Sequence, residues 1–345
     1  MDTRSQPDAA RPPHEAPFTT PAGVSRRRFV SGSLAAAAGA AVLAPDDAQA
    51  QQAARAPRAA RVAAGSRGRL PTGKIGPVTV SRLISGGNLI SGWAHARDLH
   101  YVAELMRRYN TDAKVLDTLQ LMEEHGIDTI IADPRKKPMD LFARYWRERG
   151  GRMQWIAEGH PGVDDWRTDI RRSVDFGAKA VYVQGVIADQ WLAEGRIDLL
   201  GQCVDFIKAR GVPGGIGAHQ IEVIVESEAR GFRADFYMKT CHHNQYWSGR
   251  RPDQTQRVVE NHADNYWDMD PPRTIEVMAK VRKPWIAFKV LAAGAIAPEN
   301  GFRYALENGA DFLCVGMFDF QVARNAALAR QLVAATAQRA RPWCA

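Results

Sequence analysis

The chain has 345 residues, of which 45% are hydrophobic, so it can bury a large core in one big domain or two ordinary ones. Much of its formal net charge of +8 comes from residues 51–70, which hold five arginines and no acidic residue. We interpret this stretch as a basic flexible linker, which argues against nucleic-acid binding as the function.

The first 50 residues carry the ordered features of an export signal. A twin arginine, Arg26 and Arg27, precedes a weakly hydrophobic alanine-rich run, and Ala48-Gln49-Ala50 supplies the small-x-small pattern that a signal peptidase accepts. The stretch resembles a twin-arginine signal, so we expect a periplasmic or secreted protein with the twin-arginine export machinery as a partner. The alanine run is too weakly apolar for a stable membrane span, which needs about 20 apolar residues.

Beyond Leu70, short apolar runs alternate with amphipathic patterns of helical period. The expected strands are Val78–Ile84, Ile127–Ala132, Met153–Ala157, Ala180–Val183, Gly214–Ala218, Asp235–Met238, Trp285–Phe288 and Phe312–Val315. The expected helices are Thr111–Glu124, Asp140–Arg149, Asp165–Phe176, Arg196–Arg210, Gln220–Arg230, Pro271–Val281, Pro298–Asn308 and Val322–Gln338. Strict alternation predicts parallel strands joined by helical crossovers, and the number of units favours a closed barrel. The predicted fold class is α/β, a (β/α)8 TIM barrel.

The predicted layout is a signal at 1–50, a linker at 51–69 and a barrel at 70–340. Two connections are oversized, residues 88–110 after the first strand and residues 239–270 after the sixth. Since such loops usually run to roughly six residues or fewer, we expect the second to form a flap over the barrel mouth. No Gly-x-Gly-x-x-Gly motif follows the first strand, which argues against a Rossmann fold. The four cysteines form no disulfide framework.

Polar side chains gather at the carboxyl ends of the strands, where such barrels build their active sites. The stretch YMKTCHHNQYW at 237–247 is the densest example. Strand alternation predicts that Glu158, Gln184 and His219 face the barrel axis. It also predicts that Ile286 and Phe288 face the helices, which would turn Lys289 inward. The gathered groups are Asn88, Asp133, Glu158, Gln184, His219, Lys239, Cys241, His242 and Lys289.

A carboxylate, an imidazole and an amine around one pocket suit the removal of a proton next to a carbonyl group. Lys289 would polarise the carbonyl oxygen or form a Schiff base, and Glu158 or His219 would move the proton. The expected substrate-binding residues are Asn88, Asp133, Gln184, Lys239, Tyr246 and Trp247, of which the two aromatic residues could stack on a sugar face. Alternatively, a divalent metal could be held by Glu158, His219, Cys241 and His242.

Both ends of the mature chain resemble the aldo-keto reductase barrel. The opening LPTGKIGPVTVSRLISGGN looks like that family's approach to its first strand, and FKVLAAGAIAPENGFRYALENGADFLCVGMFDFQVARNAALA looks like its seventh and eighth units. The second stretch resembles the family at several positions, which are Lys289, Gly294, Gly316-Met317 and Asn325. The resemblance implies a TIM barrel and a site at the carboxyl ends of its strands.

The chemistry implied by this resemblance does not carry over residue by residue. The catalytic aspartate and tyrosine of the family belong after the second strand, where IIADPRKKPMD offers Asp133 but no tyrosine at the expected offset. Its lysine and histidine belong at the ends of the third and fourth strands, where this chain has Glu158 and Gln184. Asp319 stands where the 2′-phosphate of NADPH would prefer a cation, so NADPH is the less favoured cofactor.

Three hypotheses follow. The first is an exported barrel enzyme, a lyase, isomerase or hydrolase, that acts on a sugar-like or carbonyl-bearing small molecule, with or without a metal. The second is a divergent NADPH-dependent oxidoreductase. The third is a non-catalytic ligand-binding barrel.

Overall fold

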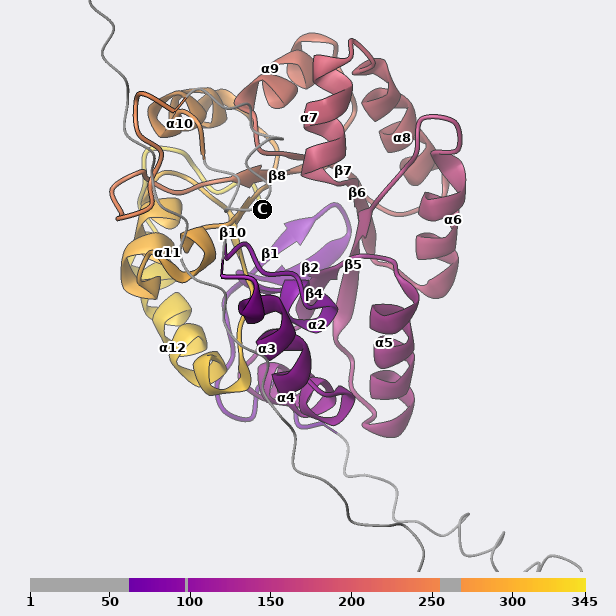
Figure 1. The fold of residues 1–345 in the computed structure, drawn as a ribbon, viewed down its shortest axis with the longest axis vertical. Coiled ribbons are helices and arrows are strands. Elements are labelled where there is room, and N and C mark those ends of the chain that lie inside the picture. The colour runs from indigo at the N-terminus through magenta and orange to yellow at the C-terminus, as the bar shows by residue number, and fades with distance from the viewer. Residues whose placement is uncertain (1–61, 97–98, 255–267) are drawn as a thin grey trace, which may run out of the picture. The chain divides into compact units, whose positions relative to one another are not determined.

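A computed structural model describes residues 62–96, 99–254 and 268–345. The predicted signal and most of the predicted linker lie outside the described residues, as does the middle of the predicted flap. Eight parallel strands close into a barrel in the order β10-β3-β4-β5-β6-β7-β8-β9, with helices around the outside (Figure 1). This arrangement confirms the predicted (β/α)8 TIM barrel. Within the described part of the chain, no helix has the length and apolar character needed to cross a membrane.

Most of the barrel strands begin and end within two residues of the predicted runs. Their bounds are β3 Leu83–Gly86, β4 Thr129–Ala132, β5 Gln154–Gly159, β6 Ala180–Val183, β7 Gly214–Ala218, β8 Phe236–Thr240, β9 Trp285–Phe288 and β10 Phe312–Val315. The helices that pair with predicted segments are α4 Asp112–Glu124, α5 Lys136–Glu148, α6 Arg167–Phe176, α8 Asp198–Ala209, α9 Ile221–Ala229, α10 Pro271–Lys280, α11 Pro298–Glu307 and α12 Asp319–Ala335. Thr111 caps α4, because its side chain accepts the Lys114 N–H.

The first predicted strand, Val78–Ile84, is wrong as a single element. Its first half forms β2 (Val78–Ser81), which pairs antiparallel with β1 (Thr72–Ile75) in a hairpin, and only its end contributes to β3. Ile75 and Val80 of the hairpin belong to the inner core of the barrel. Since Gln154 at the start of β5 donates to the carbonyl oxygen of Thr79, the hairpin closes the amino-terminal end of the barrel, opposite the expected site.

Three helices of the described residues, α2, α3 and α7, were not predicted from the sequence. The long connection after β3 holds α2 (Asn88–Ser91) and α3 (Tyr101–Tyr109), and α7 (Gly185–Ala193) follows β6 directly. Residues 62–69 lie against the end of α4, where Gly65 and Arg67 donate backbone hydrogen bonds to the carbonyls of Glu123 and Glu124. Residues 62–69 therefore pack on the barrel.

Alternation along the strands sorts the core into an outer layer under the helices and an inner layer on the barrel axis. Trp155, Val183 and Ile216 belong to the outer layer and Tyr182 belongs to the inner one, which agrees with the predicted inward direction of Glu158, Gln184 and His219. The prediction for β9 is wrong. Ile286 and Phe288 pack with the inner layer, while Trp285 and Ala287 face the helices.

Candidate active site

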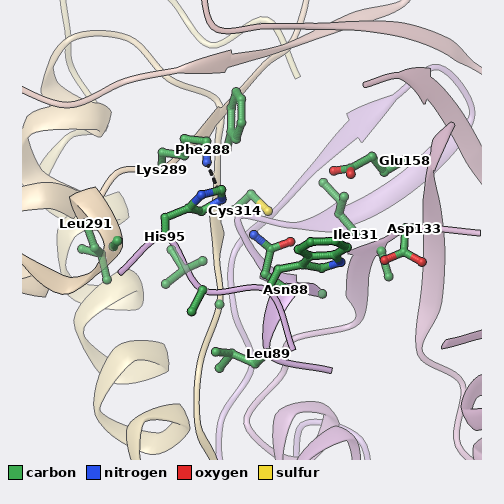
Figure 2. Close-up of a pocket in the computed structure, with 18 of the residues that line it drawn as sticks. Asn88, Leu89, His95, Ile131, Asp133, Glu158, Phe288, Lys289, Leu291 and Cys314 are labelled. Atoms are coloured by element: carbon green, nitrogen blue, oxygen red, sulfur yellow. Dashed lines mark hydrogen bonds between the residues drawn. The ribbon is translucent and has the colours of Figure 1, made fainter. Parts of the chain in front are cut away.

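A cavity of about 680 Å³ opens at the carboxyl ends of the barrel strands. Its size lies within the range typical of small-molecule sites, ~300–1,000 Å³. Six of the sequence-predicted site residues line it: Asn88, Asp133, Glu158, Gln184, His219 and Lys289. Figure 2 shows how Asn88, Asp133, Glu158 and Lys289 surround the same space from different strand ends.

Glu158, at the end of β5, is the most heavily hydrogen-bonded carboxylate of the cavity. It accepts from the Tyr182 hydroxyl (2.7 Å), the Gln184 amide (2.8 Å) and His160 Nε2 (3.0 Å). Burial alone would raise the pKa of Glu158, but these three partners favour the charged form and hold the pKa below its usual range. The side chain is therefore a fixed carboxylate at neutral pH.

His219, directly after β7, is oriented by an aspartate that the sequence analysis missed. The His219 Nδ1–H donates to Asp189 Oδ2 (2.7 Å), and the backbone N–H groups of His219 and Gln220 donate to the same carboxylate. Asp189 lies on α7 and is fully buried, and His219 is 5% exposed. Because Nδ1 carries the hydrogen, Nε2 is the ring nitrogen that can accept a proton. Burial lowers the pKa of His219, although Asp189 works in the opposite direction, so the ring is neutral at pH 7.

Lys289, directly after β9, reaches the cavity through an unusual backbone conformation. Its φ of 57° lies in the left-handed region, and Ala292 and Ala293 in the same connection also have positive φ. Such conformations are costly for non-glycine residues and concentrate at functional sites. Lys289 Nζ donates to His95 Nε2 (3.1 Å), which comes from the connection between α2 and α3 (Figure 2). The left-handed turn explains how Lys289 lines the cavity although Phe288 faces the axis.

Asp133, at the end of β4, is fixed on the other side of the cavity. It is 7% exposed and accepts the Ser91 hydroxyl (2.7 Å) and the Arg135 backbone N–H (3.1 Å). The Arg135 guanidinium lies over the Trp93 ring, 4.8 Å from its centroid. Trp93 and Arg135 thus form a linked part of the cavity rim.

The predicted site residues of the stretch 237–247 do not line this cavity. They are Lys239, Cys241, His242, Tyr246 and Trp247. Lys239 is fully buried and contacts Asp268 Oδ1 (3.3 Å) and the Thr240 carbonyl (2.9 Å). Since Phe236 and Met238 face the barrel axis, alternation turns Lys239 toward the helices. Its predicted contact with substrate is therefore corrected to a buried ion pair.

The neighbours of Lys239 in the sequence are also placed elsewhere. Cys241 belongs to the outer core layer, and burial raises its pKa above the usual range. His242 is fully buried, accepts the Asp268 backbone N–H (3.2 Å) and packs against Tyr246. Burial lowers the pKa of His242 to about 3. Tyr246 and Trp247 do not line the cavity, and Trp247 is 83% exposed.

The predicted metal set is not brought together. Glu158 and His219 line the cavity, whereas Cys241 and His242 follow the end of β8 and are buried outside the cavity lining. Across residues 62–96, 99–254 and 268–345, no three His, Cys, Asp or Glu side chains converge as metal ligands would. Cys314 also lines the cavity, but burial raises its pKa to about 12, so it is a thiol.

No family model matches the chain, and no curated protein matches it. Among solved structures, a protein described as "Putative aldo-keto reductase from Pseudomona aeruginosa" is 18% identical, with a TM-score of 0.54 over 76% of this chain and 94% of its own. A second structure described in the same terms is 17% identical, with a TM-score of 0.51 over 79% and 98%. The likeness is one of fold.

A third structure, a truncated 3-deoxy-D-arabino-heptulosonate 7-phosphate synthase from Thermotoga maritima, is 10% identical, with a TM-score of 0.48 over 79% of this chain and 95% of its own. The barrel architecture expected from the sequence is confirmed by the closed sheet and by the likeness to the two structures described as putative aldo-keto reductases. Because one barrel architecture hosts many reactions, the chemistry has to be argued from the cavity itself.

Proposed function

We propose that the protein is an enzyme that removes a proton from the carbon next to a carbonyl group, in a reaction of the lyase or isomerase type. One observation carries the proposal. A neutral histidine, His219, is held by the buried Asp189 in the same cavity as a lysine and a fixed carboxylate. Base, electrophile and anchor are the three parts that such a reaction needs.

Each group has a separate role. His219 Nε2 takes the proton from carbon, and the electron pair moves to the carbonyl oxygen to give an enolate. The Lys289 ammonium stabilises that oxygen as its negative charge develops. Glu158, held by Tyr182 and Gln184, accepts a hydrogen bond from a substrate hydroxyl and fixes its position. The substrate is therefore a hydroxylated carbonyl compound.

The positions that differ from the aldo-keto reductase pattern support this reaction over carbonyl reduction. Glu158 and Gln184 stand where the resemblance implies a lysine and a histidine, and the Tyr182 hydroxyl is engaged by Glu158. We also expect the enzyme to act outside the cytoplasm, because Arg26 and Arg27 open an ordered export-signal pattern.

The reaction can be tested without the natural substrate, by following hydrogen–deuterium exchange at the α-carbon of hydroxyketones in D₂O by NMR. We expect the protein to accelerate exchange, and we expect His219→Gln and Lys289→Met each to slow it at least about 100-fold, or ~3 kcal/mol of transition-state stabilisation. Lys289→Met keeps the aliphatic stem and removes only the charge, so stability should change little.

Two matched controls accompany these variants. His243→Gln changes a histidine that does not line the cavity, and Lys280→Met changes a lysine that is 74% exposed on α10. Both variants should catalyse α-carbon exchange at the rate of the unaltered protein. Exchange no faster than in buffer across a panel of hydroxyketones, or equal rates in His219→Gln and its control, would refute the proposal.

A further inference from the structure

The cavity has an apolar side in addition to its polar one. Apolar side chains contribute to its lining from α2, α3 and the connections after β3 and β9. They include Leu89, Trp93, Val102, Leu105, Met106 and Leu291. In Figure 2, Leu89 and Leu291 lie apart from the carboxylates of Glu158 and Asp133.

Part of this apolar side is uncovered. Trp93 is 49% exposed and Leu105 is 57% exposed, although both line the cavity. Large apolar side chains gathered at a cavity wall typically mark a binding surface, since covering them with another apolar group is favourable. The Arg135 guanidinium over the Trp93 ring helps to fix that ring at the wall.

A bare sugar does not fit these surroundings. Its hydroxyl groups can bond to Glu158 and Asp133, but those that lie against Met106 or Leu291 would lose water without gaining a partner. The volume of about 680 Å³ also leaves room beyond the groups that hold the carbonyl head. The polar side and the apolar side therefore call for different parts of one ligand.

We infer that the substrate carries an apolar tail, an aryl or alkyl group of several carbons, next to its hydroxylated carbonyl head. The inference rests on the proposed function for the position of the head. The tail lies along the wall formed by α2 and α3, and Trp93 and Leu105 cover it.

Two ketones with the same head test this directly: hydroxyacetone, and 1-hydroxy-4-phenylbutan-2-one, which adds a phenyl-bearing tail. Their affinities are measured by ligand-observed NMR titration of the full chain. We expect the tailed ketone to bind at least tenfold more tightly. In Leu105→Asp the ratio of the two affinities should fall below about threefold, because the tail would have to displace water from a carboxylate that gains no partner in exchange.

Leu99→Asp is the matched control. Leu99 is 53% exposed, close to the 57% of Leu105, but it does not line the cavity, so the ratio should stay as in the unaltered chain. Trp93→Ala is a second variant with the same expected loss, in case Leu105→Asp lowers the melting temperature.

The two proposals fail differently. Equal affinity for the two ketones, no binding of the tailed ketone, or an equal loss of the ratio in Leu99→Asp would overturn the apolar tail, whether or not α-carbon exchange is catalysed. Tight binding of the tailed ketone without any catalysed exchange would instead support the apolar site and refute the proposed reaction.

Discussion

At the scale of single residues, His219 is subject to two opposed influences on its pKa. Burial lowers the pKa, and the Asp189 carboxylate raises it by favouring the charged ring. The net result is a pKa below the usual value, so the base is in its neutral, active form at neutral pH. The acid limb of the exchange rate should follow this pKa, with activity lost as pH falls through it.

Asp189→Asn tests this balance. The substitution keeps the shape of the side chain but removes the charge that raises the pKa of His219 and fixes the proton on Nδ1. We expect the exchange rate to fall by about 100-fold or more, as for misoriented catalytic histidines in general, and its acid limb to move to lower pH. The rate is measured against pH by NMR, with thermal unfolding as a check on folding. A lower rate with an unmoved acid limb would mean that Asp189 supports only the local packing of α7.

Asp189 also shows what the sequence could signal. An acidic residue inside the apolar pattern GVIADQWLA is expensive to bury without partners, so its presence marks a functional or structural pairing. The partner could not be named, because His219 lies 30 residues away and the contact depends on how α7 packs beside β7. The same holds for His95, which meets Lys289 across 194 residues.

At the scale of elements, the inward and outward faces of β5, β6 and β7 were predicted correctly, and those of β9 were not. Glu158, Gln184 and His219 mark the inner face at the ends of three strands, whereas Trp285–Phe288 is apolar on both faces. A strand that is buried on both faces has no alternation of polar and apolar residues, so its sequence does not show which side chains face the axis. Lys289 was predicted to face inward for the wrong reason, since its left-handed φ, and not alternation, turns it toward the cavity.

The connection after β8 supports a prediction about stability. Lys239 and Asp268 form an ion pair in which both side chains are nearly fully buried, at 0% and 2% exposure. Lys239→Met leaves the Asp268 carboxylate without its cation, which should cost ~3–5 kcal/mol in the free energy of unfolding measured in urea. Burial already raises the pKa of Asp268 and Lys239 opposes that rise, so the variant's pKa is higher still. The loss should therefore shrink as pH falls and Asp268 is protonated.

The double variant Lys239→Met/Asp268→Asn is the control, because it removes both charges. It should recover part of the lost stability, and α-carbon exchange should slow far less in either protein than in Lys289→Met. If Lys239→Met has normal stability but does not catalyse exchange, the structural role is wrong and Lys239 is a substrate-binding residue.

At the scale of the whole molecule, the alternation of strands and helices was enough to predict the closed barrel. The repeat is strong because every unit must bury one face of a strand and one stripe of a helix. The hairpin of β1 and β2 was not predicted, because Val78–Ile84 was interpreted as one continuous strand, although the polar pair Ser81-Arg82 marks the break between β2 and β3. The barrel has two differently built ends, because the carboxyl ends of the strands hold the cavity and the hairpin closes the opposite end.

Asp311 ties the closed end together. It precedes β10 and accepts hydrogen bonds from Arg339 (3.0 Å), Arg341 (2.8 Å) and the backbone N–H groups of Trp285 and Cys344. Its side chain and those of both arginines are at most 2% exposed. The Trp343 ring lies between Arg339 and Arg82, whose guanidinium carbons are 3.5 and 4.2 Å from its centroid. One carboxylate therefore joins β9, β10 and the last residues of the chain.

Asp311→Asn should destabilise the protein without affecting catalysis. It leaves two buried guanidinium groups without their anion, which we expect to cost ~3–5 kcal/mol in urea unfolding. The matched control is Asp205→Asn, whose partner Arg233 is 69% exposed, and which should cost less than about 1 kcal/mol. Because Asp311 stands at the amino-terminal end of its strand, away from the cavity, the α-carbon exchange rate of the folded variant should match that of the unaltered chain. Equal unfolding free energies for the two variants would show that the arginines are satisfied by backbone carbonyls alone, and a lowered exchange rate would show that the two ends of the barrel are coupled.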